Sequence, residues 1–256
     1  HLFRFDIAEK EYRKTIEKDP NHVKGRCSLA RLLLLQRQPN EALELFRSCD
    51  VGRTAYAAEI GMAQCYKAMG EVEKSQPLLR KAVEADPKEV ERSYQAVDEK
   101  PERLVAASDL GCIETELGNF QEAKRLLELA LDFNPLDSIA RYSYAVSLRG
   151  LGLQKESEEN FERTRVSRKA LDQVTVLKEK VLRNLKDTEA RLQIGKIILE
   201  HESERTGVYW IQSVFSYDPT NSDAHAALVD YYGRKKNEQD KYKQLIEYHR
   251  QFVTKN

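Results

Sequence analysis

Histidine and cysteine side chains offer the most direct route to chemistry, since imidazoles and thiolates bind metals and serve as acids, bases or nucleophiles. The five histidines are His1, His22, His201, His225 and His249. None has a second His or Cys at metal-ligand spacing on the same helical face. The pair His201-Glu202 is not followed by the second histidine of an HExxH zinc motif. The sequence therefore predicts isolated histidines, each solvated or packed, and no metal site.

The four cysteines are too few for a disulfide framework. They are Cys27, Cys49, Cys65 and Cys112, and no two of them have CxxC spacing. This spacing does not suit a zinc site either. We expect them to be small core residues.

Glycine-rich phosphate-binding motifs are absent from the sequence. It contains neither GxxxxGK[ST] nor GxGxxG, and Gly150-Leu151-Gly152 follows no predicted strand. Spacing alone does not exclude a Ser/His/Asp or Cys/His arrangement, but no residue is singled out for one. The prediction is a non-enzymatic chain without a cofactor.

Composition narrows the possible partners. The 256 residues include 42 basic and 42 acidic side chains, so the formal net charge is zero, which disfavours binding to nucleic acid. Only 11 glycines and 7 prolines interrupt the chain, which favours long helices. The longest apolar run, Leu32–Leu35, is far shorter than the ~20 residues that span a bilayer, so no membrane insertion is expected. The opening at His1 without a methionine suggests a piece of a longer protein.

An internal period organises the sequence. Asp-Pro or Asn-Pro pairs end at Pro20, Pro87, Pro135 and Pro219. Their intervals fit one unit of about 34 residues if two insertions are allowed. Because proline disfavours the α conformation in the residue before it, each pair is expected to end a helix.

Small and large side chains keep a fixed register inside each unit. Before Pro135 the small residues are Gly111, Ala123 and Ala130, and the bulky residue is Leu127. Small residues let two antiparallel helices approach closely, while the bulky one fills the groove between neighbours. The C′ position that ends the first helix of a pair suits Gly70, Gly118 and Gly152.

This pattern resembles the tetratricopeptide repeat family, whose unit is a 34-residue helix–turn–helix. The resemblance implies an all-α fold, an α-solenoid of antiparallel helix pairs wound into a right-handed superhelix. The expected layout is a half repeat (second helix only) at 1–22, repeats at 23–89, an insertion at 90–103, repeats at 104–171, a helical extension at 172–187, and C-terminal repeats with a cap at 188–256.

The two interruptions have different sequences. We expect residues 90–103 to be a short helical or irregular insertion, ending before a helix that begins near Pro101. In the second interruption Val174, Leu177 and Val181 recur at helical spacing, and neither glycine nor proline occurs from Leu153 to Ile194. This predicts one long helix near 155–184, which would offset the final repeats.

In this family the first helix of each pair lines the concave surface. By register the resemblance places on that surface Lys24, Arg31, Gln64, Lys67, Asp109, Tyr142, Arg149, Gln193, Lys196 and Asp230. Four of them, Arg31, Lys67, Arg149 and Lys196, could pair acidic side chains or a carboxylate of an extended peptide, or could simply solvate the groove. The cation clamp that holds the tails of chaperones is absent, because Val105 and Asp109 occupy its third site.

The resulting hypothesis is a protein-interaction scaffold that binds a peptide or protein segment, with some preference for acidic segments. The alternative is a regulatory or substrate-docking module of a larger enzyme or multidomain protein. Self-association through exposed terminal helices is also open. The final helix carries Leu245, Ile246, His249, Phe252 and Val253 on one face, which we expect to cap the last repeat or, if left open, to bind a partner. The C-terminal stretch is similar to repeats of some exported bacterial members of the family, which weakly favours an exported protein.

Overall fold

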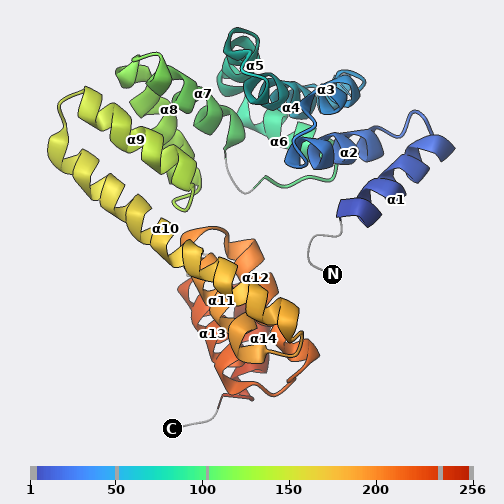
Figure 1. Cartoon of the computed structure of the whole chain (residues 1–256), viewed down its shortest axis with the longest axis vertical. Coiled ribbons are helices and arrows are strands. Elements are labelled where there is room, and N and C mark those ends of the chain that lie inside the picture. Colours follow the sequence, from blue (N-terminus) through green and yellow to red (C-terminus); the bar gives the residue numbers. More distant parts are fainter. Residues whose placement is uncertain (1–4, 50–51, 102–103, 236–238, 254–256) are drawn as a thin grey trace. The chain divides into compact units, whose positions relative to one another are not determined.

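A computed structural model describes residues 5–49, 52–101, 104–235 and 239–253. The described residues form α-helices and two short 3-10 segments, without a β-strand (Figure 1). The predicted all-α repeat fold is therefore confirmed. The chain divides into two compact units, 1–160 and 161–256, and the division falls inside helix α10.

Unit 1 is a succession of short helices. Its helices are α1 (Phe5–Lys18), α2 (Val23–Leu35), α3 (Pro39–Arg47), α4 (Ala55–Ala68), α5 (Val72–Glu84), α6 (Pro87–Ala96), α7 (Val105–Glu116), α8 (Phe120–Phe133) and α9 (Ser138–Gly150), with the 3-10 segment η1 (Gly52–Thr54) before α4. Each helix packs on its neighbour in sequence from α1 to α5 and from α7 to α9. The first helices of successive pairs also pack on one another, as α2 does on α4 and α7 on α9.

Unit 2 begins within α10 (Gln154–Arg183) and continues with α11 (Thr188–His201), α12 (Glu204–Gln212), the 3-10 segment η2 (Ser213–Ser216), α13 (Ser222–Arg234) and α14 (Gln239–Arg250). Its cores lie between α10, α11 and α12, and between α11, α12, α13 and α14. The sole tryptophan, Trp210, is buried there at 2% exposure.

The predicted small residues do bring helices into close contact. A Cβ added to Gly111 of α7 would lie 2.6 Å from Cγ of Leu127 on α8. The turn after the first helix of a pair has a left-handed glycine, with φ of 79° at Gly70, 78° at Gly118 and 78° at Gly152. These positions were predicted as helix ends because glycine adopts positive φ without steric cost.

The long helix is confirmed, from Gln154 to Arg183. Val174, Leu177 and Val181 are buried along it, as their spacing predicts. The two compact units meet between Asn160 and Phe161, earlier in the chain than the predicted extension at 172–187. The offset of the final repeats stays a prediction.

Of the two forms expected for the insertion, helical or irregular, the structure has a helix, which begins earlier than residue 90. Asp86 caps a new helix, α6, by accepting a hydrogen bond from the backbone N–H of Lys88 at 2.9 Å, and Pro87 occupies its first turn. The same Asp-Pro pair that follows α5 thus starts the next helix, since proline suits the first helical position. The following helix begins at Val105, not near Pro101 as predicted.

All four cysteines are buried and unbonded by disulfides, as expected of core residues. Among the described residues, no helix is long and apolar enough to cross a membrane.

Candidate functional site

The ten predicted groove residues fall into both units. Seven lie on α2, α4, α7 and α9 of unit 1, while Gln193, Lys196 and Asp230 lie on α11 and α13 of unit 2. The ion-pair partners and the exposure of these residues differ between the two units, as described below for each helix.

The two predicted groove residues of α2 form ion pairs with acidic residues of the same chain. Lys24 Nζ lies 2.6 Å from Oδ2 of Asp98, and the Arg31 guanidinium forms an ion pair with Glu99. Both acids follow α6, in a turn where Asp98 has a φ of 57°. Burial raises the pKa of Glu99, and the charge of Arg31 opposes that rise.

Arg31 is further fixed by aromatic rings. Its Cζ lies 5.5 Å from the ring centroids of both Phe46 and Tyr94, a cation–π arrangement. Lys24 and Arg31 are thus paired with acids of the insertion, and binding of a peptide by these two residues stays a prediction. The insertion folds its acidic end onto α2.

Three further predicted residues come together between α4 and α7. Lys67 Nζ lies 3.1 Å from Oδ1 of Asp109, and Gln64 Nε2 donates to Oδ2 of the same carboxylate at 3.3 Å. Asp109 is only 3% exposed. A buried carboxylate needs such partners, so this cluster holds adjacent repeats together and Lys67 is engaged within the chain. On α9, Tyr142 and Arg149 are exposed.

In unit 2 the predicted residues Lys196 and Asp230 line one cleft, between α11 and α13. Its volume is about 530 Å³, and its walls are Lys196, Leu199, Glu200, Glu204, Ala227, Asp230, Tyr231, Arg234 and Lys235. Gln193 is outside this lining and donates its amide to Glu189 at 2.6 Å.

Most charges of this cleft are paired at its rim. Lys235 Nζ lies 2.5 and 2.7 Å from the two oxygens of Glu204, which also accepts from the Tyr231 hydroxyl at 3.2 Å. Burial, followed by the charge of Glu204, raises the pKa of Tyr231 and keeps the phenol protonated. Asp230 forms an ion pair with Arg234.

Lys196 and Glu200 are the exceptions. Both are exposed on α11, one turn apart, and neither forms an ion pair with any described residue. Of the four cations expected to recognise acidic partners, Arg31 and Lys67 are engaged within the chain, whereas Lys196 has no charged partner among the described residues.

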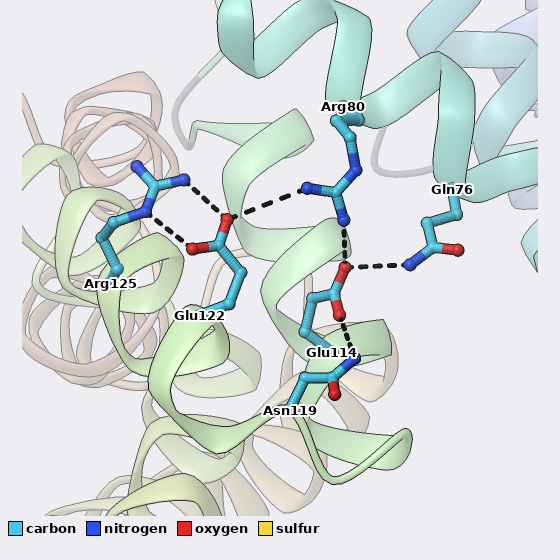
Figure 2. Close-up of polar contacts among 6 residues, drawn as sticks. All are labelled: Gln76, Arg80, Glu114, Asn119, Glu122 and Arg125. Carbon is cyan, nitrogen blue, oxygen red and sulfur yellow. Dashed lines mark hydrogen bonds and ion pairs between the residues drawn. The ribbon is translucent and has the colours of Figure 1, made fainter.

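A second polar cluster, between α5, α7 and α8, was not predicted (Figure 2). Glu114 is only 2% exposed, and its Oε1 accepts hydrogen bonds from Arg80 at 2.5 Å and from Gln76 at 2.9 Å. Its Oε2 accepts one from Asn119 at 2.8 Å. Arg80 also approaches Glu122 at 3.9 Å. The one sign of this cluster in the sequence was Glu114 itself, an acid three residues after Gly111 on the packed face of α7.

Replacing Arg80 by alanine should destabilise unit 1 by about 1–3 kcal/mol, because among the described residues it is the only cation bonded to the buried carboxylate of Glu114. The matched control is Arg125→Ala, which removes an exposed pair with Glu122 and should cost less than about 1 kcal/mol. Urea unfolding followed by circular dichroism distinguishes them. Equal losses of unfolding free energy in the two variants would show that the buried Glu114 cluster stabilises unit 1 no more than the exposed pair does.

The prediction of isolated histidines is wrong for two of the five. His225 of α13 and His249 of α14 are buried, and their Nδ1 atoms are 2.7 Å apart. Because the two histidines lie far apart in sequence, no short-range spacing indicated that they meet. Among the described residues, no group of three His, Cys, Asp or Glu side chains could hold a metal ion.

Three models of the tetratricopeptide repeat match this sequence, at residues 11–44, 33–95 and 108–173. Together they cover more than half of the chain. The chain belongs to the tetratricopeptide repeat (TPR) family. Proteins of this family are typically non-catalytic, and these repeats make the chain a protein-interaction scaffold in the general sense.

Solved structures with similar folds include several TPR proteins. The crystal structure of MamA is 22% identical, covers 62% of this chain and 86% of its own, and has a TM-score of 0.47. YrrB, described as a TPR protein with an unusual peptide-binding site, is 16% identical, with coverages of 84% and 96% and a TM-score of 0.46. MamA from Desulfovibrio magneticus RS-1 is 12% identical, with coverages of 84% and 97% and a TM-score of 0.39. The search of curated protein sequences found no match.

Proposed function

We propose that this TPR scaffold binds an extended segment of another protein in the cleft between α11 and α13, with Lys196 pairing an acidic side chain of that segment. The observation that carries the proposal is the contrast among the predicted groove cations. Lys24, Arg31 and Lys67 already hold carboxylates of the same chain, whereas Lys196 is exposed in a cleft and has no ion pair with a described residue.

The lining of the cleft suits a peptide. Leu199 and Ala227 provide apolar surface for one side chain of the segment. The ion pair between Glu204 and Lys235 and the hydroxyl of Tyr231 border this surface with fixed polar groups. Such an arrangement of apolar floor and polar rim is typical of peptide recognition.

The charges favour one acidic residue over an acidic run. Glu200 lies one helical turn after Lys196 and is exposed without an ion pair to a described residue. A second acid of the segment placed beside Glu200 would be repelled. The preferred segment therefore carries an acid facing Lys196, with a neutral or basic residue facing Glu200.

The class of acidic partners that we propose is narrower than the one expected from the sequence, because only one acid of the segment pairs with the cleft. The proposal rests on Lys196 of unit 2 and does not require the other three cations, Arg31, Lys67 and Arg149. The alternative, a docking module of a larger protein, stays a prediction that the full-length gene product would test.

Peptide display on the immobilised chain would test the proposal. A peptide selected for binding should lose about tenfold in affinity with Lys196→Glu, because attraction becomes repulsion across the cleft. The matched control is Lys243→Glu, on an exposed position of α14 outside the cleft lining, which should leave the affinity within twofold.

Charge exchange makes the test specific. A peptide in which the key acid is replaced by lysine should bind Lys196→Glu better than it binds the unmodified chain. Equal loss of affinity in Lys196→Glu and Lys243→Glu, or no recovery with the exchanged peptide, would contradict the assignment of Lys196.

A further inference from the structure

Two buried imidazoles join the last two helices. His225 on α13 is 1% exposed and His249 on α14 is 5% exposed, and their Nδ1 atoms lie 2.7 Å apart. The ring of His225 stacks on Phe215 and on Phe252, with both centroid distances at 4.3 Å. Tyr248 packs edge-on against both histidines. The two rings therefore meet in an aromatic, water-poor environment.

The hydrogen-bond partners assign the protons. Nε2 of His225 lies 3.0 Å from the backbone oxygen of Pro219, which can only accept, so this nitrogen carries a proton. In neutral His225, Nδ1 is then unprotonated and accepts a hydrogen bond from Nδ1–H of His249. One proton between the two Nδ1 atoms satisfies both rings.

A further proton on either imidazole would place a positive charge in this buried site without a hydrogen-bonded carboxylate to stabilise it. A proton on Nε2 of His249 creates a buried imidazolium, and a second on Nδ1 of His225 sets two N–H groups and two cations against each other. No carboxylate of a described residue hydrogen-bonds to either ring. Of the acids near the pair in sequence, Asp218 is bonded to Thr220 and Asn221, while Asp223 and Glu247 are exposed to solvent.

The other titratable rings against the pair are tyrosines. They are Tyr232 of α13 and Tyr248 of α14, which lie 6.2 and 5.1 Å from the His249 centroid. Burial raises the pKa of Tyr232, so that phenol stays neutral in mild acid and cannot offset a positive charge. Burial also lowers the pKa of His249, and so does the neighbouring His225.

We propose that the His225–His249 contact is a pH-sensitive latch, which holds α14 against α13 near neutral pH and releases α14 in mild acid. The segment released carries Tyr242 and Ile246, which pack on the core cluster formed with Leu228 and Tyr232. Acid therefore exposes an apolar face of the last repeat. This inference is independent of the peptide cleft.

The direction of the pH dependence follows from linkage. An unfolded histidine has a pKa of about 6.5, and that of folded His249 is lower. Below about pH 6.5 the released state consequently binds more protons than the latched state. The stabilisation is complete above that pH and is lost as the pH falls toward the folded pKa.

Hydrogen–deuterium exchange at pH 7.5 and 5.5, corrected for intrinsic exchange, tests the latch in the intact chain. We expect exchange in α14 to increase at least tenfold at pH 5.5, with a much smaller change in α11. In His249→Asn the side-chain amide still offers an N–H to His225 but does not titrate, so the acid-induced increase should fall to within threefold. The control His201→Asn removes a histidine of α11 that contacts Ser167 and should behave as the unmodified chain.

Equal protection of α14 at both pH values, or the same acid response in His249→Asn and the unmodified chain, would overturn the proposal. Nitrogen-detected NMR of the unmodified chain needs no variant. It should show Nε2–H on His225, Nδ1–H on His249, and titration of His249 below pH 6.5. Titration of His249 at or above about pH 6.5 would equally refute the latch.

Discussion

Replacing Phe46 by alanine will lower the free energy of unfolding of unit 1 by about 3–5 kcal/mol. Phe46 of α3 is fully buried, and its ring lies where a Cβ of Gly61 on α4 would be, 2.5 Å away. The glycine leaves no side chain to refill the space. Alanine therefore creates a cavity between two helix pairs and also removes one of the rings that hold Arg31.

Urea unfolding measured by circular dichroism would show this loss. The matched control is Leu35→Ala on α2, where the side chain is 71% exposed and the expected change is below about 0.5 kcal/mol. Fluorescence of Trp210, which lies in unit 2, gives a separate reading of that unit. Similar losses for Phe46→Ala and Leu35→Ala would mean that the packing of α3 on α4 does not stabilise the repeats.

Replacing Gly207 by alanine should destabilise unit 2 by about 2–3 kcal/mol. Gly207 lies on α12, and a Cβ there would be 2.5 Å from both the backbone N and the Cα of Leu199 on α11. Backbone atoms cannot rotate away as a flexible side chain would. The two helices must separate, which disrupts the packing around Ile211.

Gly233→Ala is the matched control and should act in the opposite direction. Gly233 also lies within a helix of unit 2, but a Cβ there meets nothing within 4 Å. Alanine is then expected to stabilise the unit by about 0.5–1 kcal/mol, through helix propensity alone. Denaturation followed by Trp210 fluorescence measures both variants. If both glycine variants were stabilising, the close approach of α11 and α12 would not be required.

The helical repeat was predictable because its determinants are local in sequence. Gly111 and Leu127 mark a close helix contact, and Gly118 marks the turn between the two helices. The long helix α10 followed from the absence of glycine and proline over its length. These features depend on backbone conformation and on packing within one repeat, both of which short-range spacing encodes.

The start of α6 was missed because one dipeptide has two roles. Asp86-Pro87 was taken as the end of a helix, and it is also the N-cap and first turn of the next. The same local pattern permits both, and the surrounding chain decides between them.

The partners of the groove cations could not be inferred from spacing. Lys24 and Asp98 are 74 residues apart, so their pairing depends on the tertiary fold of the insertion. The meeting of His225 with His249 depends likewise on the docking of α14. Lys196 and Asp230, in contrast, share a cleft because they lie on the first helices of consecutive repeats, which the register predicts.

The central claim is that a partner segment binds between α11 and α13. Amide exchange with and without a display-selected peptide, measured over the intact chain at neutral pH, tests it most directly. We predict increased protection around Lys196–Glu204 and Ala227–Lys235, and loss of that protection in Lys196→Glu. Protection confined to unit 1, or to α14, with no change along α11 and α13 would contradict the account.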